Sequence, residues 1–173
     1  MMELYLITGF LGAGKTTFLK NFARQFAGRR LRLIINEFGR AGVDGTLLRE
    51  LDAALDEISN GSIFCACRLD QFEAALEQAA ADAPDVVLVE ASGLADPTNV
   101  RRVLAQFPAV SYQGSVCVAD AARLEKVFST ARACPRQLAV SSLVLLNKTD
   151  LATEAQCAEA KALILRANPA ARI

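Results

Sequence analysis

Short apolar runs alternate with longer amphipathic segments along the whole chain. Five runs are continuously apolar rather than alternating with polar residues, at 4–8, 31–35, 86–89, 115–119 and 143–146. Strands that are buried on both faces have this pattern. Between the runs, apolar residues recur with helical spacing, in stripes at 18–26, 69–79 and 100–107. This order predicts an α/β fold, a mostly parallel sheet with helices on both faces.

One further helix is expected near the end of the sequence. Thr153 is a suitable N-cap, and Asn168-Pro169 would end a helix that reaches about residue 166. The length fits one domain, and we expect residues 1–173 to form it. Parallel sheets bind ligands at the carboxyl ends of their strands, so the informative residues should follow the apolar runs.

A glycine-rich loop follows the first apolar run. It reads Gly-Phe-Leu-Gly-Ala-Gly-Lys-Thr-Thr, which satisfies G-x-x-x-x-G-K-[ST] between a strand and a helix and predicts a P-loop NTPase. Backbone N–H groups of such a loop point at phosphate oxygens, Lys15 neutralises the β- and γ-phosphates, and Thr16 ligates Mg²⁺. The predicted nucleotide contacts here are Gly9, Gly12, Ala13, Gly14, Lys15, Thr16 and Thr17. The alternative is a flexible glycine turn without a ligand.

A second motif follows the last apolar run. Asn147-Lys148-Thr149-Asp150 matches the N-K-x-D tetrapeptide of GTPases. An ionised Asp150 accepts two hydrogen bonds, which suits the N1–H and 2-amino groups of guanine and leaves adenine without a match. We expect Lys148 to lie over the base and Asn147 to join this loop to the phosphate loop. The alternatives are a polar turn that caps a strand, and an ATP-dependent enzyme.

Composition excludes several functional classes. Basic and acidic residues are equal in number, so no nucleic acid partner is expected. No apolar run is long enough to span a membrane and no leader peptide is visible, which favours a cytoplasmic protein with reduced thiols. Histidine is absent, which removes the commonest general base and metal ligand. The five cysteines are irregularly spaced and do not form a disulfide framework.

Three more segments, together with the phosphate loop, resemble the GTPase domain of the CobW-like proteins. They are Asn36-Glu37-Phe38-Gly39, the stretch 59–65 reading Ser-Asn-Gly-Ser-Ile-Phe-Cys, and the stretch 90–97 reading Glu-Ala-Ser-Gly-Leu-Ala-Asp-Pro. CobW-like proteins belong to the G3E group of SIMIBI-class P-loop GTPases, with the nickel-insertion GTPases of urease and hydrogenase. The resemblance implies GTP hydrolysis to GDP with Mg²⁺, metallochaperone or cobalamin-linked work for a client metalloprotein, and a homodimer.

The resemblance also implies roles for residues beyond the two motifs. Glu37 would lie in the first switch region, Glu90 would hold Mg²⁺ or its water, and Gly93 would sense the γ-phosphate through its N–H. Lys15, Glu90 and Gly93 would then be the catalytic group. The alternatives are a surface carboxylate at Glu37 and a solvated strand end at Glu90. For Asp120, the sequence favours a helix cap and a site residue equally.

The chain departs from the family at its metal motif. The family's Gly-Cys-x-Cys-Cys is replaced here by Gly-Ser-Ile-Phe-Cys, with Cys67 two residues after Cys65. Two thiolates, Cys65 and Cys67, are too few ligands for Zn²⁺ or Co²⁺, so Glu37 or a second subunit would have to contribute. A degenerate site, in a regulatory nucleotide-binding module with little turnover, is the alternative. Cys117 and Cys157 are expected in the core and Cys134 in a loop, and the family's C-terminal domain is not expected within these residues.

Overall fold

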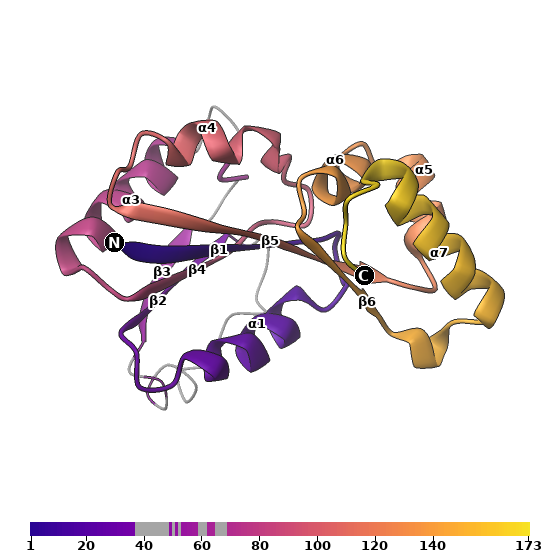
Figure 1. Cartoon of the computed structure of the whole chain (residues 1–173), viewed down its shortest axis with the longest axis horizontal. Helices are drawn as coiled ribbons and strands as arrows, with labels where there is room; N and C mark the ends of the chain where they lie inside the picture. The colour runs from indigo at the N-terminus through magenta and orange to yellow at the C-terminus, as the bar shows by residue number, and fades with distance from the viewer. Residues whose placement is uncertain (37–48, 50, 52, 59–61, 65–68) are drawn as a thin grey trace.

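A computed structural model describes residues 1–36, 49, 51, 53–58, 62–64 and 69–173. All neighbouring strand pairs of its six-stranded sheet are parallel, in the order β3-β2-β4-β1-β5-β6 (Figure 1). The strands are β1 (Met2–Thr8), β2 (Leu31–Asn36), β3 (Ala54–Ile58), β4 (Val86–Glu90), β5 (Val110–Asp120) and β6 (Leu143–Asn147). The predicted α/β class with a parallel sheet is confirmed.

Helices cover both faces of this sheet. They are α1 (Lys15–Ala23), α3 (Leu69–Asp82), α4 (Val100–Leu104), α5 (Leu124–Thr130), α6 (Ala133–Ala139) and α7 (Glu154–Ala167), with 3₁₀ turns η1 (Arg24–Phe26), η2 (Pro97–Asn99) and η3 (Thr149–Leu151). Figure 1 shows α1 below the sheet, α3 and α4 above it, and α5, α6 and α7 gathered at the β6 end. None of the described helices has the length and apolar character that a membrane span needs.

The core divides into layers because side chains alternate across each strand. Leu33 and Leu88 face α1 and pack with its buried Leu19. Leu6 and Val89 face the opposite side, where Phe72 of α3 packs against them. The layer under α5, α6 and α7 is built from β5 and β6 residues such as Cys117 and Val144, with Leu138 and Ile164 from the helices. Strands buried on both faces explain why the apolar runs predicted them.

Strand β3 was not predicted from the sequence. Two of its five residues, Asp56 and Glu57, are charged, as an edge strand allows. The buried Arg32 of β2 explains why β3 lies beside β2. Its guanidinium donates two hydrogen bonds to Asp56 of β3, from Nε to Oδ2 at 2.6 Å and from Nη2 to Oδ1 at 2.9 Å. The same guanidinium also pairs with Asp82 of α3. A local sequence pattern does not reveal such a partner.

The cysteine predictions need two corrections. Cys134 lies in helix α6, not in a loop, and is buried. Pro135 was the reason to expect a loop, but proline is tolerated in the first turn of a helix, where N–H groups have no intrahelical acceptor. Cys117 is buried in β5 as expected, whereas Cys157 in α7 is only half-buried.

The predicted last helix is confirmed as α7. Its N-cap is Thr153, whose hydroxyl accepts a hydrogen bond from the Gln156 N–H at 3.2 Å. The Gln156 side chain bonds back to the Thr153 N–H at 2.9 Å, which completes a capping box. The expected stop also holds, since the helix ends at Ala167, before Asn168-Pro169.

Candidate functional site

The loop after β1 has a backbone that only glycine adopts without strain. Gly9 has φ 133°, and a Cβ there would lie 2.2 Å from the carbonyl oxygen of Val118. Gly14 has φ 105°, and a Cβ there would lie 2.5 Å from Asn147 Nδ2. Helix α1 begins directly after this loop, at Lys15. The loop therefore presents a helix N-terminus and backbone N–H groups to the carboxyl edge of the sheet, an arrangement that suits an anion.

Lys15 brings a cation to the same loop. Its side chain is buried, and Nζ lies 3.4 Å from the Phe10 carbonyl oxygen, which accepts its hydrogen bond. The ammonium group is thus held within the curve of the loop rather than in open solvent. Lysine at this point supplies a positive charge for phosphate oxygens.

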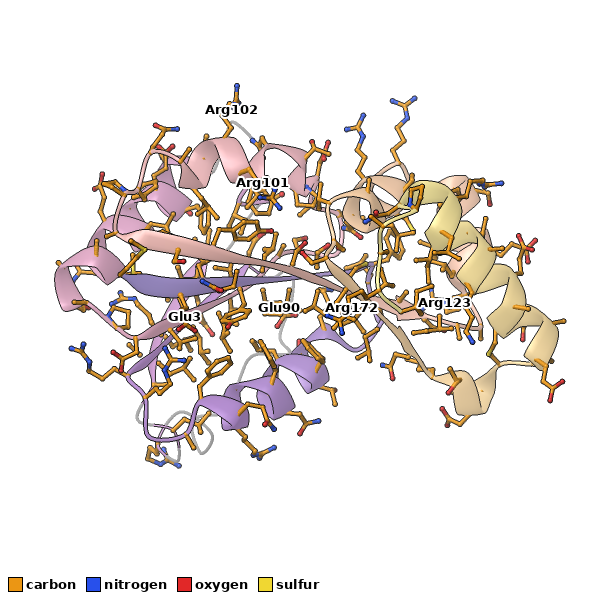
Figure 2. The ribbon with its side chains drawn as sticks, viewed as in Figure 1. Glu3, Glu90, Arg101, Arg102, Arg123 and Arg172 are labelled. Atoms are coloured by element: carbon orange, nitrogen blue, oxygen red, sulfur yellow. The ribbon has the colours of Figure 1, made fainter. Side chains whose placement is uncertain are left out.

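Thr16 and Glu90 meet although 74 positions separate them. The Thr16 hydroxyl donates to Glu90 Oε1 at 2.9 Å. Glu90 is the last residue of β4, pairs in register with Ile7 of β1, and is buried. Figure 2 shows Glu90 near the centre of the molecule, close to the first turn of α1. A hydroxyl and a carboxylate oxygen side by side are ligands that Mg²⁺ prefers, so this pair fits the predicted magnesium site.

The segment after β4 packs directly against the phosphate loop. A Cβ on Gly93 would lie 2.6 Å from the Leu11 nitrogen. From the other side, Gln137 of α6 donates through Nε2 to the carbonyl oxygens of Gly93 at 3.1 Å and Ala95 at 2.9 Å. Gln137 is buried, and the sequence offered no signal for it because nothing local distinguishes a glutamine in a short helix.

Asp96 holds the end of this segment. Its carboxylate caps η2 through the Thr98 N–H and also pairs with Arg136 of α6. Burial raises the pKa of the Asp96 carboxyl, but hydrogen bonds from Thr98 and from Arg136 outweigh it, so the net pKa is lowered. The segment is therefore anchored to α6 by two side chains, Asp96 and Gln137.

The tetrapeptide after β6 is joined to the phosphate loop, as the sequence predicts for Asn147. Asn147 Nδ2 donates to the Ala13 carbonyl oxygen at 2.9 Å, and Lys148 Nζ donates to the Gly12 carbonyl oxygen at 2.6 Å. Lys148 adopts a left-handed backbone with φ 58°. Such strain persists only where the surroundings enforce it, and it is commonest at functional sites.

Asp120 caps a turn rather than a helix, since the N-cap of α5 is Arg123 and has no side-chain cap hydrogen bond. Its Oδ1 accepts from the Ala122 N–H at 3.1 Å, which caps the turn after β5. Its Oδ2 lies 2.8 Å from Lys148 Nζ, and Asp120 is paired in register with Asn147. Asp120 therefore fixes the direction of the Lys148 side chain. Asp150 itself is exposed on η3. The turn there is held by a hydrogen bond from the Leu151 N–H to the Lys148 carbonyl oxygen at 3.0 Å.

The predicted transition-metal ligands Glu37, Cys65 and Cys67 lie outside the described residues. Burial raises the pKa of the Cys117 thiol to about 12 and that of the Cys134 thiol to about 11, so both stay protonated near neutral pH. A protonated thiol is a poor metal ligand. Within the described part of the chain, no three or more acidic or cysteine side chains gather into a metal-binding group.

Comparison with known proteins identifies the family. The sequence profile of the CobW/HypB/UreG nucleotide-binding domain matches residues 3–173. The chain belongs to this family. It is 32% identical to the zinc chaperone CobW of Pseudomonas aeruginosa, over 98% of this chain and 55% of that protein. It is also 32% identical to the zinc chaperone YeiR of Escherichia coli, over 88% of this chain and 48% of that protein. The chain thus spans about half the length of these relatives.

Solved structures agree with the fold. The Zn(II)-bound YjiA GTPase of Escherichia coli superposes with a TM-score of 0.72 at 24% identity, over 98% of this chain and 56% of that one. The hydrogenase maturation factor HypB of Archaeoglobus fulgidus superposes with a TM-score of 0.62 at 20% identity, over 99% of this chain and 79% of that one. The P-loop GTPase fold of the CobW/HypB/UreG domain is therefore confirmed.

Proposed function

We propose that this domain binds GTP with Mg²⁺, hydrolyses it to GDP and phosphate, and uses the cycle to deliver a transition metal ion to a client metalloprotein. The observation that carries the proposal is the junction of three parts at one sheet edge. The phosphate loop meets the tetrapeptide through Asn147 and Lys148, and it meets Glu90 through Thr16. These contacts support a single nucleotide site, in which the loop would bind the phosphates, Thr16 and Glu90 would hold Mg²⁺, and Asp150 would read guanine.

The proposed chemistry relies on positioning and charge, with no covalent protein intermediate. Loop N–H groups and Lys15 hold the β- and γ-phosphates, and the Gly93 N–H contacts the γ-phosphate. Thr16 and Glu90 would hold Mg²⁺ or its water, and the bound ion would supply positive charge next to the phosphates. Since the sequence offers no obvious arginine finger or water-positioning glutamine, intrinsic turnover should be slow, on the order of 10⁻⁴ to 10⁻² s⁻¹. A second copy of the chain is the proposed partner that raises it.

The decisive experiment is phosphate release from GTP by the Lys15→Ala variant. Loss of the ammonium group removes the charge that faces the phosphates, so we expect turnover to fall to background. Lys161→Ala, on the exposed surface of α7, is the control and should keep wild-type turnover. Undiminished phosphate release in Lys15→Ala would refute GTP hydrolysis at this loop.

The metal part of the proposal is tested separately. We propose that Cys65, Cys67 and Glu37 bind Zn²⁺ or Co²⁺, supported by relatives that are zinc chaperones. Competition titration with a chromogenic chelator should show zinc affinity falling at least about tenfold in Cys65→Ser, because a thiolate ligand is lost. The buried Cys117→Ser is the matched control and should leave zinc affinity unaltered.

The spacing Cys65-Ala66-Cys67 favours one second candidate, a regulatory nucleotide-binding module without metal. Zinc affinity that is weak and equal in wild type and Cys65→Ser, together with GTP binding but no turnover, would support that candidate. We place either activity in the cytoplasm, and neither requires a nucleic acid or a membrane.

A further inference from the structure

The turn after β5 places an arginine beside the phosphate loop. Arg123 is the N-cap residue of α5, and its N–H donates to the Asp120 carbonyl oxygen at 3.2 Å. Its own carbonyl oxygen accepts from the Val127 N–H at 3.0 Å, so the backbone at Arg123 is held on both sides. From this fixed backbone the side chain reaches the loop, since a Cβ on Gly12 would lie 3.4 Å from Arg123 Nη1.

Strand order explains why an arginine in this turn meets the loop. Strand β5 lies between β1 and β6 and is parallel to both, so the turn after β5 lies between the phosphate loop and the tetrapeptide after β6. Lys148 of that tetrapeptide donates to the Gly12 carbonyl oxygen at 2.6 Å, so two cationic side chains meet at this glycine. Figure 2 shows Arg123 apart from Glu90, so Arg123 does not belong to the proposed magnesium pair.

The charge of Arg123 is not compensated by the protein. Within the described part of the chain, no carboxylate pairs with its guanidinium. Asp120 uses Oδ1 for the Ala122 N–H and Oδ2 for Lys148 Nζ. The charges of Asp120 and Lys148 offset each other, which leaves the charge of Arg123 beside Gly12. A guanidinium suits phosphate there, because its planar fork can donate two parallel hydrogen bonds to phosphate oxygens.

A cavity beside the loop gives this guanidinium room to turn. Phe10, Leu11 and Ala13 line the cavity on the loop side, and Arg123 and Leu124 line it on the α5 side. Arg123 is the only cation among the described residues that line the cavity. Its side chain is also exposed, so it can reorient toward a ligand without displacing packed side chains.

We propose that Arg123 binds the α- and β-phosphates, which GDP and GTP share. The inference rests on the proposed function, because it adds a contact to the same nucleotide. Lys15, at the start of α1, is assigned to the β- and γ-phosphates. Arg123 comes from the turn between the loop and the tetrapeptide, so it reaches the phosphates nearer to the nucleoside. Its contact is the same before and after hydrolysis, so it raises nucleotide affinity and leaves the rate of the chemical step unchanged.

The test is calorimetric titration with GDP and GTP in Mg²⁺. Loss of a hydrogen bond to a charged group commonly weakens binding about tenfold or more, so Arg123→Ala should bind each nucleotide at least about tenfold more weakly. Its turnover at saturating GTP should stay within about twofold of the wild type, because the contact is equal in ground and transition states.

Arg102→Ala is the matched control. It removes an exposed arginine of α4 whose side chain projects away from the sheet (Figure 2), and it should leave both affinities unchanged. Equal affinities in Arg123→Ala and Arg102→Ala would overturn the proposal. A loss confined to GTP would overturn the assignment to the shared phosphates.

Two further variants separate the charge of Arg123 from support of the loop. Arg123→Lys keeps the charge and should bind GDP more tightly than Arg123→Ala. Arg123→Gln keeps N–H donors without the charge and should bind GDP about as weakly as Arg123→Ala. Salt screens exposed charges, so GDP affinity should fall less steeply with ionic strength in Arg123→Ala than in the wild type. Equal salt dependence, with the lysine variant no better than the glutamine variant, would contradict a phosphate contact.

Inorganic pyrophosphate distinguishes failure of this inference from failure of the proposed function, because it carries phosphates without a base. It should raise the melting temperature of the wild type and raise that of Arg123→Ala less. If pyrophosphate stabilises the wild type in this way but neither guanine nucleotide does, the proposed function is wrong and Arg123 remains a phosphate-binding residue. An equal rise in both proteins, or no rise with pyrophosphate, GDP or GTP, would overturn the assignment of Arg123.

Discussion

At the scale of single residues, the tetrapeptide at the end of β6, which we propose reads the base, combines backbone strain with side-chain restraint. Lys148 has a left-handed backbone, which costs about 1–2 kcal/mol for a residue with a Cβ. Its ammonium group is held by Asp120 and by the Gly12 carbonyl oxygen. These contacts offset the strain and direct the loop so that Asp150 follows on the exposed turn η3. The position of Asp150, the residue proposed to read the base, therefore depends on its neighbours.

The Asp150→Asn variant tests whether that side chain selects guanine. A carboxylate accepts from both guanine N1–H and the 2-amino group, whereas a carboxamide presents one acceptor and one donor. The variant loses a charge-assisted hydrogen bond to guanine, and its amide N–H faces a guanine N–H. Together these two effects should lower GTP affinity by roughly 10²-fold or more. Xanthine carries a carbonyl in place of the 2-amino group, so affinity for xanthosine triphosphate should rise. Titration calorimetry measures both.

Glu154→Gln provides the control for this change, since it removes a nearby exposed carboxylate at the start of α7. It should leave the affinities for both nucleotides as in the wild type. If Asp150→Asn keeps the wild-type preference for GTP, another group reads the base.

At the scale of secondary-structure elements, the edge strand β3 depends on one buried cation. Arg32 has a side chain that is 7% exposed, and it pairs with Asp56 of β3 and Asp82 of α3. These ion pairs join two strands and a helix on one side of the sheet. A buried guanidinium needs such partners, because desolvation of an unpaired charge is costly.

Arg32→Ala should lower the free energy of unfolding by about 2–4 kcal/mol, because two carboxylates lose their partner and a buried side chain leaves a void. Arg30→Ala is the control: Arg30 pairs with Asp85 at the surface, with side chains 67% and 42% exposed, and should cost less than about 1 kcal/mol. Urea unfolding of the three proteins gives the values. Equal losses in both variants would show that the Arg32 pairs add nothing beyond a surface ion pair.

At the scale of the whole molecule, the site is assembled from loops after β1, β4 and β6 rather than from one element. Ligand that contacts all three loops should stabilise the folded state as a unit. A ligand present at 100 times its dissociation constant adds about 2.7 kcal/mol to the free energy of unfolding. For a chain of this length, that corresponds to a rise in melting temperature of roughly 5–10 °C.

Thermal melting in the presence of nucleotides checks this expectation. GTP with Mg²⁺ should raise the melting temperature, ATP with Mg²⁺ should not, and EDTA should reduce the GTP effect because Thr16 and Glu90 lose their shared ion. Lys15→Ala should abolish the shift. An equal shift with ATP would contradict guanine selection, and an EDTA-insensitive shift would contradict the magnesium pair.

Local patterns in the sequence were sufficient for much of the fold and for the identity of the motifs. Five of the strands, helix α7 with its Thr153 cap, and the glycine loop were predicted in place. Each rests on residues close together in the chain: continuous apolar runs, an N-cap threonine, and glycines at positions that need their backbone freedom. Local patterns did not predict β3, α5 and α6. These elements are short, and contacts with distant parts of the chain stabilise them.

The composition of the site depended on which strands lie beside each other. Thr16 reaches Glu90 because β4 neighbours β1, and Asn147 reaches Ala13 because β5 lies between β1 and β6. The contacts of Gln137 emerged only from the structure, since its partners, the carbonyl oxygens of Gly93 and Ala95, are distant along the chain. The local sequence thus determined which residues form the motifs and what chemistry they have. Strand order brought these residues together, and strand order depends on the long-range packing of the sheet and on its crossover connections.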